Sequence, residues 1–244
     1  YCRKVCMTFN FFSQGWTGTE RPSLWLKEVA AYGKNAYVAG LLRLLEQQNP
    51  KKVFELGLGN GFPFAAALLE KNIEVHGCDV SQFLLDELAG KYPAIVWHHA
   101  GYDNMTEELH GETFDVVYCL RSSWYFSDIL VALKNMLASA RPGGVILFDI
   151  MNSESPDIIT FKKVMRKEKY RTFFKNGVKF FLNKVARTNY VYGRAMDKNY
   201  PVSPRTIEAF LEKQKLSFQK FTFAQVAGER SDFDPQAFRI LYVV

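Results

Sequence analysis

Short apolar runs alternate with longer amphipathic stretches along the middle of the chain. The apolar runs are KKVFELG, IEVHGCDV, AIVWHH, FDVVYCL and GVILFDIM, and helix-like stretches such as SQFLLDELAGKY and SDILVALKNMLASA lie between them. Continuous apolar runs are typical of parallel strands buried on both faces, and the intervening stretches are typical of crossover helices. The pattern predicts a doubly wound α/β sheet over residues 51–152.

The pattern changes on both sides of this region. Residues 21–50 have helical apolar spacing, which stops at the turn signal Asn49-Pro50. Toward the C-terminus, SPRTIEAFLEKQ predicts a helix with Ser203 as its N-cap and Pro204 in its first turn. FQKFTFAQV and AFRILYVV predict two closing strands, and the turn-like AGERSDFDPQ between them favours a hairpin.

Three glycines follow the first predicted strand at alternate positions: Gly57, Gly59 and Gly61. Ligands of such sheets bind at the carboxyl ends of the strands, where a glycine-rich turn lets the backbone approach a nucleoside. The G-x-G-x-x-G pattern of dinucleotide sites lacks its third glycine here, and no P-loop Gly-Lys-Ser/Thr follows. The chain instead has E-x-G-x-G-x-G beginning at Glu55, and Asp79 ends the next strand, where a carboxylate accepts hydrogen bonds from a ribose diol.

These residues resemble the class I S-adenosylmethionine-dependent methyltransferases over roughly residues 51–152. ELGLGNG resembles the first cofactor motif, VHGCDVS the second, and FDVVYCLRS and ARPGGVILFDIMN the later ones. The resemblance implies a Rossmann-like seven-stranded sheet with a C-terminal hairpin, methyltransferase activity, and S-adenosyl-L-methionine as cofactor. The cofactor-binding residues that follow from it are Glu55, Gly57, Gly59, Gly61, Asp79, Val80, Gly101, Tyr102 and Leu120.

One segment departs from the family's pattern. An acid that reaches the adenine amino group often follows the third strand in this family. Here Tyr102 stands in that position, and Asp103 follows one residue later. Two readings stay open: Asp103 takes the role of the acid, or Tyr102 stacks on the adenine.

Polar residues predicted at carboxyl ends of strands are candidates for the chemistry. Methyl transfer requires alignment and exclusion of water, and a hydroxyl acceptor also requires a general base, whereas an amine needs only to be neutral. The candidates are His99, as the first choice of base, Asp103 and Asn152. A satisfied strand-end histidine is the alternative for His99, and turn formation is the alternative for Asn152. His98 points to the opposite face from His99, and His76 is expected to be structural.

The segment LRSSWYFSD, after the fourth strand, is expected to line the acceptor cleft. Arg121 can bind an anion, while Trp124 and Tyr125 can wall the acceptor or simply pack against the next helix. Ser127 is the expected N-cap of that helix. We find no metal-ligand spacing in the sequence and predict no metal site.

Charge is concentrated after the fifth strand. The net charge is +6, yet residues 160–200 hold twelve Lys or Arg and two acids, which gives +10 there and −4 elsewhere. Such a block indicates a partner: a small acidic acceptor such as a phosphorylated or nucleotide-linked sugar, RNA, or an anionic membrane surface. We favour the small acceptor, because no separate RNA-binding domain is visible. Our candidates in this acceptor cap are Arg171, Lys175, Arg187, Tyr190, Tyr192 and Arg194.

The predicted organisation has four parts. They are an N-terminal helical lid implied by the resemblance (1–50), a cofactor-binding core (51–152), a basic and aromatic cap (153–202), and a closing helix and hairpin (203–244). No 18-residue apolar run, signal peptide or CxxC pair is present, so we expect a cytoplasmic protein with reduced thiols. The predicted reaction is methyl transfer to a small anionic acceptor, with oxygen favoured. An RNA methyltransferase and a non-catalytic binding protein are the alternatives.

Overall fold

Seven strands form one sheet within residues 35–186 and 200–244, the part of the chain that the computed structural model describes. Their order is β3-β2-β1-β4-β5-β7-β6, and only β7 runs antiparallel to its neighbours. This confirms the predicted doubly wound, seven-stranded sheet. The strands are β1 (Lys52–Leu56), β2 (Glu74–Asp79), β3 (Val96–His99), β4 (Phe114–Cys119), β5 (Ala140–Met151), β6 (Gln219–Thr222) and β7 (Arg239–Val243).

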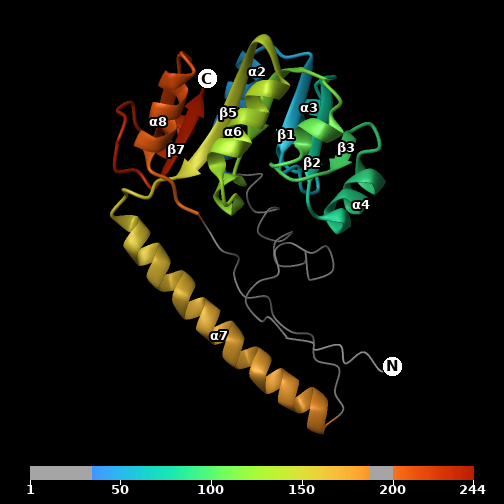
Figure 1. Cartoon of the computed structure of the whole chain (residues 1–244), viewed down its shortest axis with the longest axis vertical. Helices are drawn as coiled ribbons and strands as arrows, with labels where there is room; N and C mark the ends of the chain where they lie inside the picture. The colour runs from blue at the N-terminus through green and yellow to red at the C-terminus, as the bar shows by residue number, and fades with distance from the viewer. Residues whose placement is uncertain (1–34, 187–199) are drawn as a thin grey trace.

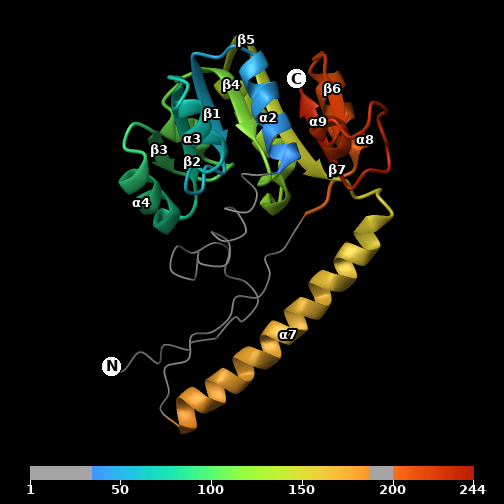
Figure 2. The same cartoon turned by 180° about the vertical axis from the view of Figure 1, so that it is seen from behind.

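Helices cover both faces of the sheet and create two hydrophobic cores (Figures 1 and 2). One face packs against α5, α6 and α8, and the other packs against α2, α3, α4 and α9. Successive strand residues point to opposite faces, so Phe54 lies in the first core and Val53 lies in the second. These helices are α2 (Ala36–Gln47), α3 (Phe64–Leu69), α4 (Gln82–Lys91), α5 (Met105–Glu108), α6 (Ile129–Ser139), α8 (Pro204–Lys213) and α9 (Phe223–Ala227).

The described part of the predicted lid is a core helix. Tyr37, Val38, Leu41 and Leu45 of α2 are all buried against the sheet, as Figure 2 shows for the helix as a whole. Asn35 caps it by accepting a hydrogen bond from the backbone N–H of Tyr37. The remaining residues of the predicted lid, before 35, lie outside the described residues.

The structure corrects two local predictions. The closing strand β6 ends at Thr222, and FAQVA forms α9 instead of continuing the strand. The Thr222 side chain accepts from the N–H of Gln225, whose side chain accepts from the N–H of Thr222, and this reciprocal capping box starts the helix. The N-cap of α6 is Asp128 rather than Ser127, because the Asp128 carboxylate accepts the two exposed N–H groups. Helix α8 begins after Ser203, as predicted.

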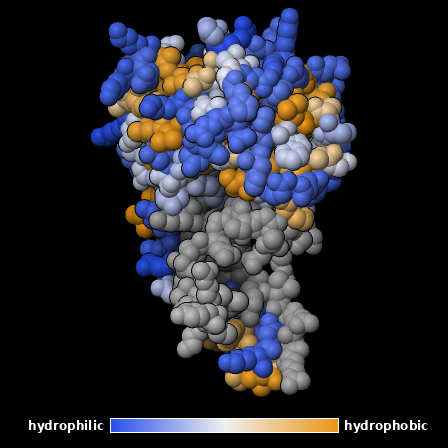
Figure 3. All heavy atoms as spheres, turned by 45° about the vertical axis from the view of Figure 1, so that its right-hand side comes forward, coloured by the Kyte–Doolittle hydropathy of each residue, from blue (hydrophilic) through white to orange (hydrophobic). Residues whose placement is uncertain are grey.

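The basic insert leaves and rejoins the core at one point. Asn152 and Val202 form a parallel bridge, supported by hydrogen bonds from the N–H of Val202 to Met151 O and from the N–H of Ser153 to Val202 O. Between them, α7 (Asp157–Val185) is a single helix that projects away from the sheet (Figure 1). Hydrophilic and hydrophobic residues lie side by side at its far end (Figure 3). In the described ranges, no helix is apolar over a length that would span a membrane.

Candidate functional site

The glycine loop after β1 takes backbone conformations that other residues adopt only with strain. Gly57, Gly59 and Gly61 have φ angles of 85°, 56° and 79°. A Cβ atom on Gly57 would lie 2.6 Å from Ser122 Oγ, and one on Gly61 would lie 2.7 Å from Leu88. The loop therefore needs its glycines both for its shape and for its close contact with the segment that follows β4.

Asp79 fixes this loop at the end of β2. One carboxylate oxygen accepts from the N–H of Gly59 at 2.9 Å, and the other accepts from the N–H of Ser81 at 2.8 Å. Burial raises the pKa of Asp79, and these backbone hydrogen bonds act in the opposite direction. Each oxygen retains a second lone pair, so the carboxylate can still accept bonds from a ribose diol. Val80, which is 52% exposed, lies directly beside it.

Glu55 lies beneath the loop and is buried. Tyr118 of β4 donates to its carboxylate at 3.0 Å. Burial raises the pKa of Glu55 to about 8, and the hydrogen bond from Tyr118 lowers it against that effect. The acid of the predicted motif thus pairs with β4 inside the sheet, two residues before the glycine loop.

The segment after β3 joins the cofactor edge to α6. The N–H of Gly101 donates to Asn104 at 2.7 Å. The Tyr102 ring packs on Phe126 with a centroid distance of 4.7 Å, and its hydroxyl lies 2.7 Å from Ser127 Oγ. Asp103 is exposed. The Tyr102 side chain is therefore held against the segment that precedes α6, and Asp103 is the freer of the two candidates for the adenine contact, which stays a prediction.

His99 and Asn152, predicted for the chemistry, are far apart in the sheet. His99 ends β3, and β2 and β1 separate it from β4; its ring nitrogen lies 3.1 Å from Val80 O. Asn152 is buried, and its amide donates to Pro235 O and Ala237 O. His99 thus lies beside Val80 at the end of β2, whereas Asn152 holds the loop before β7.

Arg121 follows β4 in a left-handed conformation, with φ of 65°. Such a conformation is uncommon outside glycine and is frequent at functional sites. The N–H of Arg121 donates at 2.7 Å to Asp149, a fully buried carboxylate in β5, and Tyr37 donates to the same carboxylate at 3.4 Å. Burial raises the pKa of Asp149, and the positive charges of Arg239 and Arg121 oppose that shift.

A pocket of about 470 Å³ opens beside Arg121. Tyr37 and Phe223 stack within it, with ring centroids 3.4 Å apart, and the Arg239 guanidinium lies 4.2 Å from the ring centroid of Trp124. Arg121 lines this pocket, and the next residue, Ser122, lies against Gly57 of the glycine loop. The pocket therefore adjoins the predicted cofactor site. The described residues that line it are Asn35, Tyr37, Arg121, Thr222, Phe223, Ala224, Arg230, Asp234, Ala237, Phe238 and Arg239.

Sequence reasoning did not connect three residues of this region: Tyr37, Asp149 and Arg239. Tyr37 and Asp149 are 112 positions apart, and Arg239 begins a closing strand, so no local motif joins them. The sequence does contain one signal of such a contact. Asp149 is a carboxylate in the otherwise apolar run GVILFDIM, and a buried acid needs partners.

The other predicted acceptor residues fall into three groups. Trp124 is buried with Met151 and Ile158, and Leu120 is buried just after β4, whereas Tyr125 is 38% exposed. Arg171 and Lys175 are exposed on α7. The remaining cap candidates lie outside the described residues: Arg187, Tyr190, Tyr192 and Arg194.

The site therefore combines two functions at one edge of the sheet. The glycine loop and Asp79 lie at this edge, where a nucleoside is predicted to bind, and a cationic, aromatic pocket lies beside them at the β4 end. Such a pair of neighbouring sites can align a donor with an acceptor for an in-line transfer.

Comparisons with known proteins agree with this geometry. A family model described as a methyltransferase domain matches residues 29–214. Mouse glycine N-methyltransferase is 30% identical over 135 residues, which are 48% of this chain and 45% of that protein. The chain thus spans less than half the length of this relative.

Two solved structures share the fold. A methyltransferase from Clostridium acetobutylicum superposes with a TM-score of 0.59 at 16% identity, covering 90% of this chain and 98% of its own. Magnesium protoporphyrin IX methyltransferase from Synechocystis, with bound S-adenosylhomocysteine, gives 0.57 at 12% identity, covering 96% and 90%. With S-adenosylmethionine as its cofactor, the chain belongs to the methyltransferase domain family, within the class I S-adenosylmethionine-dependent methyltransferases.

Proposed function

We propose that this methyltransferase acts on a small acceptor that carries an anionic group. The observation that carries the proposal is the lining of the pocket beside the glycine loop by Arg121 and Arg239. Guanidinium groups bind carboxylates and phosphates through paired, charge-assisted hydrogen bonds. A pocket of about 470 Å³ suits a metabolite rather than a folded polymer.

The geometry favours nitrogen over oxygen as the methylated atom. A hydroxyl acceptor requires a general base, and His99, the first candidate for that base, lies three strands away from the β4 end. None of the described lining residues is a histidine, and a neutral amine requires no base. The mouse relative is named for glycine, an amine that also carries a carboxylate. We therefore propose an amino acid-like amine, with phosphorylated or nucleotide-linked sugars as the second group to test.

The test measures S-adenosylhomocysteine formation with pairs of acceptors that differ only in the anionic group, such as glycine and methylamine. We expect turnover with the anionic member only. We expect Arg239→Gln to raise KM for that acceptor at least tenfold, because one bidentate contact is lost. Arg43→Gln, an exposed arginine on α2, is the matched control. Equal KM values for both variants would contradict the proposal, and no acceptor-dependent turnover would favour the non-catalytic alternative.

RNA is the second candidate, and helix α7 is the observation that favours it. Lys162, Lys163, Arg166 and Lys167 are exposed on this helix, as are Phe173 and Phe174 further along. Cations with interleaved aromatic side chains suit single-stranded nucleic acid. A gel shift at increasing salt, paired with methylation of total RNA, distinguishes the two candidates. Salt-sensitive binding together with methylation of the RNA would favour RNA over the small acceptor as the substrate.

A further inference from the structure

Two histidines and a carboxylate converge on one face of the sheet, near the first residues of β1 and β2. His76 comes from β2, His98 from β3, and Glu112 from the loop that precedes β4. Their nearest ligand-type atoms all lie within 4.8 Å of one another. His76 is only 4% exposed. The cluster lies on the face that contains Phe54 and Phe114, away from the glycine loop.

Two ring nitrogens of this cluster are buried without a hydrogen-bond partner: His76 Nδ1 and His98 Nε2. The other nitrogen of His76 lies 2.7 Å from the Glu74 carboxylate. An N–H at that position donates to Glu74, and Nδ1 then carries a lone pair directed at Glu112 Oε2, 3.5 Å away. Buried polar atoms without partners are uncommon and costly.

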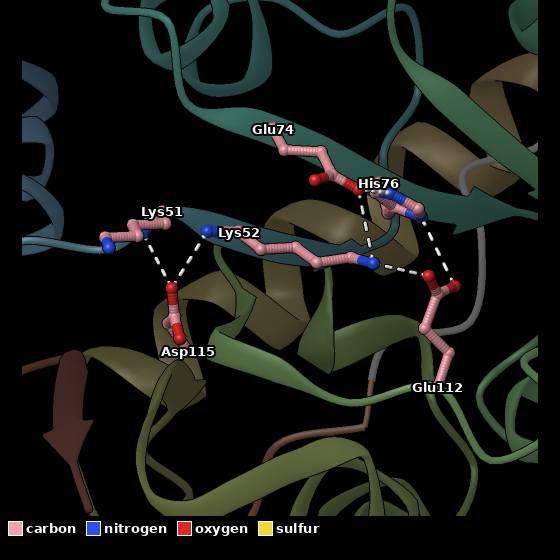
Figure 4. A network of polar contacts seen from close by, with 6 residues as sticks. All are labelled: Lys51, Lys52, Glu74, His76, Glu112 and Asp115. Carbon is pink, nitrogen blue, oxygen red and sulfur yellow. Dashed lines mark hydrogen bonds and ion pairs between the residues drawn. The ribbon is translucent and has the colours of Figure 1, made fainter.

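The surrounding residues orient the cluster, as Figure 4 shows for His76, Glu74, Glu112 and Lys52. Lys52 contacts one oxygen of Glu112 and lies 3.2 Å from Glu74, so the second Glu112 oxygen faces His76. Histidines that bind metals usually donate their other ring N–H to a carboxylate, which fixes the tautomer and the ring orientation. Glu74 stands in that position for His76. Two carboxylates and one ammonium, from Glu74, Glu112 and Lys52, leave a net negative charge around the two imidazole rings.

We propose that His76 Nδ1, His98 Nε2 and Glu112 Oε2 bind a zinc ion, with water as the fourth ligand. Imidazole and carboxylate ligands suit Zn²⁺, whereas Mg²⁺ and Ca²⁺ prefer sites made of oxygen alone. At tetrahedral zinc these atoms stand roughly 3.4 Å apart, so the side chains must approach by about an ångström. The ion would connect β2, β3 and the loop before β4. The proposal departs from the expectation of no metal site, which rested on the absence of a short spacing motif, because these ligands come from three separate segments.

The experiment uses full-length protein without a histidine tag, stripped with a chelator and dialysed. Zinc chloride is titrated calorimetrically, and thermal unfolding is followed with and without the ion. We expect one zinc ion per chain with a micromolar or lower Kd, a raised Tm, and no response to magnesium chloride. Cobalt(II) in place of zinc should give the visible absorption of a four-coordinate site.

The matched variants are His98→Ala and His99→Ala, which replace adjacent histidines that point to opposite faces. We expect His98→Ala and Glu112→Gln to weaken zinc binding at least a hundredfold, and His99→Ala to leave it unchanged. Glu74→Gln should weaken it about 10- to 100-fold, as loss of an outer carboxylate does. Glu112 is half-buried in a loop, so its variant provides the readout even if His98→Ala does not fold.

Two outcomes would overturn the proposal. The first is no zinc binding by the stripped wild-type protein below about a hundredfold excess of the ion. The second is binding that Glu112→Gln and His98→Ala leave unchanged, which would mean that zinc is held elsewhere, for example by thiols.

Discussion

Buried carboxylates support both halves of the site at the scale of single residues. Glu55 lies under the glycine loop, and Asp149 lies under the Arg121 backbone; burial is the largest influence on each pKa and raises both. Each accepts hydrogen bonds from neighbouring strands or loops. Such acids stabilise a loop's position at a cost in stability when they ionise.

Replacement of Glu55 by glutamine should change how stability depends on pH. The pKa of Glu55 is about 8 in the folded chain and about 4.3 when exposed. The folded state therefore holds a proton that the unfolded state releases, and stability from this group falls as pH rises from about 4.3 to 8. Glu55→Gln lacks this loss, so its stability relative to wild type should increase with pH, by up to about 1.4 kcal/mol per unit. Urea unfolding at pH 5, 7 and 9 measures the difference, with the exposed Glu107→Gln as control; parallel profiles for wild type and Glu55→Gln would refute it.

Asp79→Asn should weaken cofactor binding. The variant keeps the shape of the side chain, but its NH2 group replaces an oxygen that accepts from the N–H of Gly59 or Ser81. It also lacks the negative charge that strengthens hydrogen bonds from the ribose hydroxyls. We expect the affinity for S-adenosylhomocysteine to fall by roughly 1–3 kcal/mol, measured by calorimetry. Asp86→Asn, on the exposed face of α4, is the control. Equal affinities would remove Asp79 from the cofactor site.

Sequence reasoning found the residues whose role depends on local spacing. Gly57 and Asp79 stand at strand ends that the hydrophobic pattern identifies, so their place together at this edge of the sheet was predictable. The acceptor half depends on contacts such as Tyr37 with Asp149, which only the packing of α2 on the sheet brings together. His99 ends β3 as predicted, but its separation from β4 depends on the strand order, which local spacing does not give.

At the scale of elements, helices α2 and α9 pack unusually closely. A Cβ atom on Gly40 of α2 would lie 1.9 Å from the carbonyl oxygen of Val226 in α9. This contact positions Tyr37 and Phe223, which stack in the pocket. The helix pair therefore shapes the acceptor side of the site.

Gly40→Ala should destabilise the protein even though alanine is the better helix former. The clash must separate α2 from α9, and overpacking of this kind costs about 1–3 kcal/mol. Gly90→Ala, in α4, is the matched control, because a Cβ atom there meets nothing within 4 Å and alanine should stabilise a helix by up to about 1 kcal/mol. Thermal or urea unfolding should give opposite signs for the two variants; the same sign in both would contradict the close packing.

Element prediction failed where a short signal was outweighed by a longer pattern. FQKFTFAQV has alternating apolar residues that predict a strand, yet Thr222 and Gln225 have the spacing of a capping box. The helix forms because these two side chains satisfy its first N–H groups. The N-cap of α6 was mispredicted for a similar reason. Ser127 and Asp128 are both good N-cap residues, and only the backbone geometry selects Asp128.

At the scale of the whole molecule, α7 is an insertion after β5 that contributes nothing to the seven-stranded sheet. Its first turn is anchored by Ile158, which is buried with Trp124 and Met151. Further along, Tyr170, Phe174 and Phe181 are exposed. Among the described residues, the two hydrophobic cores that cover the sheet contain none from α7, and Phe161, in the second turn of α7, packs on Phe238.

Replacement of residues 163–199 by a flexible glycine-serine linker should therefore leave the core folded. We expect S-adenosylhomocysteine affinity within about threefold of wild type, measured by calorimetry, and a loss of acceptor turnover if the insert forms the acceptor cap. A variant in which the exposed Arg171 and Lys175 become glutamine tests the cap without shortening the chain. Loss of cofactor affinity in the shortened protein would show that the insert belongs to the cofactor site.

The bridge between Asn152 and Val202 has a consequence for how such enzymes diversify. Because the two ends of the insertion are already joined by the core's own backbone bonds, a mutation that lengthens, shortens or exchanges the segment between them leaves β5 and α8 in place. Substitutions in a segment that serves as acceptor cap can then change acceptor recognition while the donor site keeps its structure. Descendants of one ancestral gene would keep the glycine loop and Asp79 while differing most between residues 153 and 201.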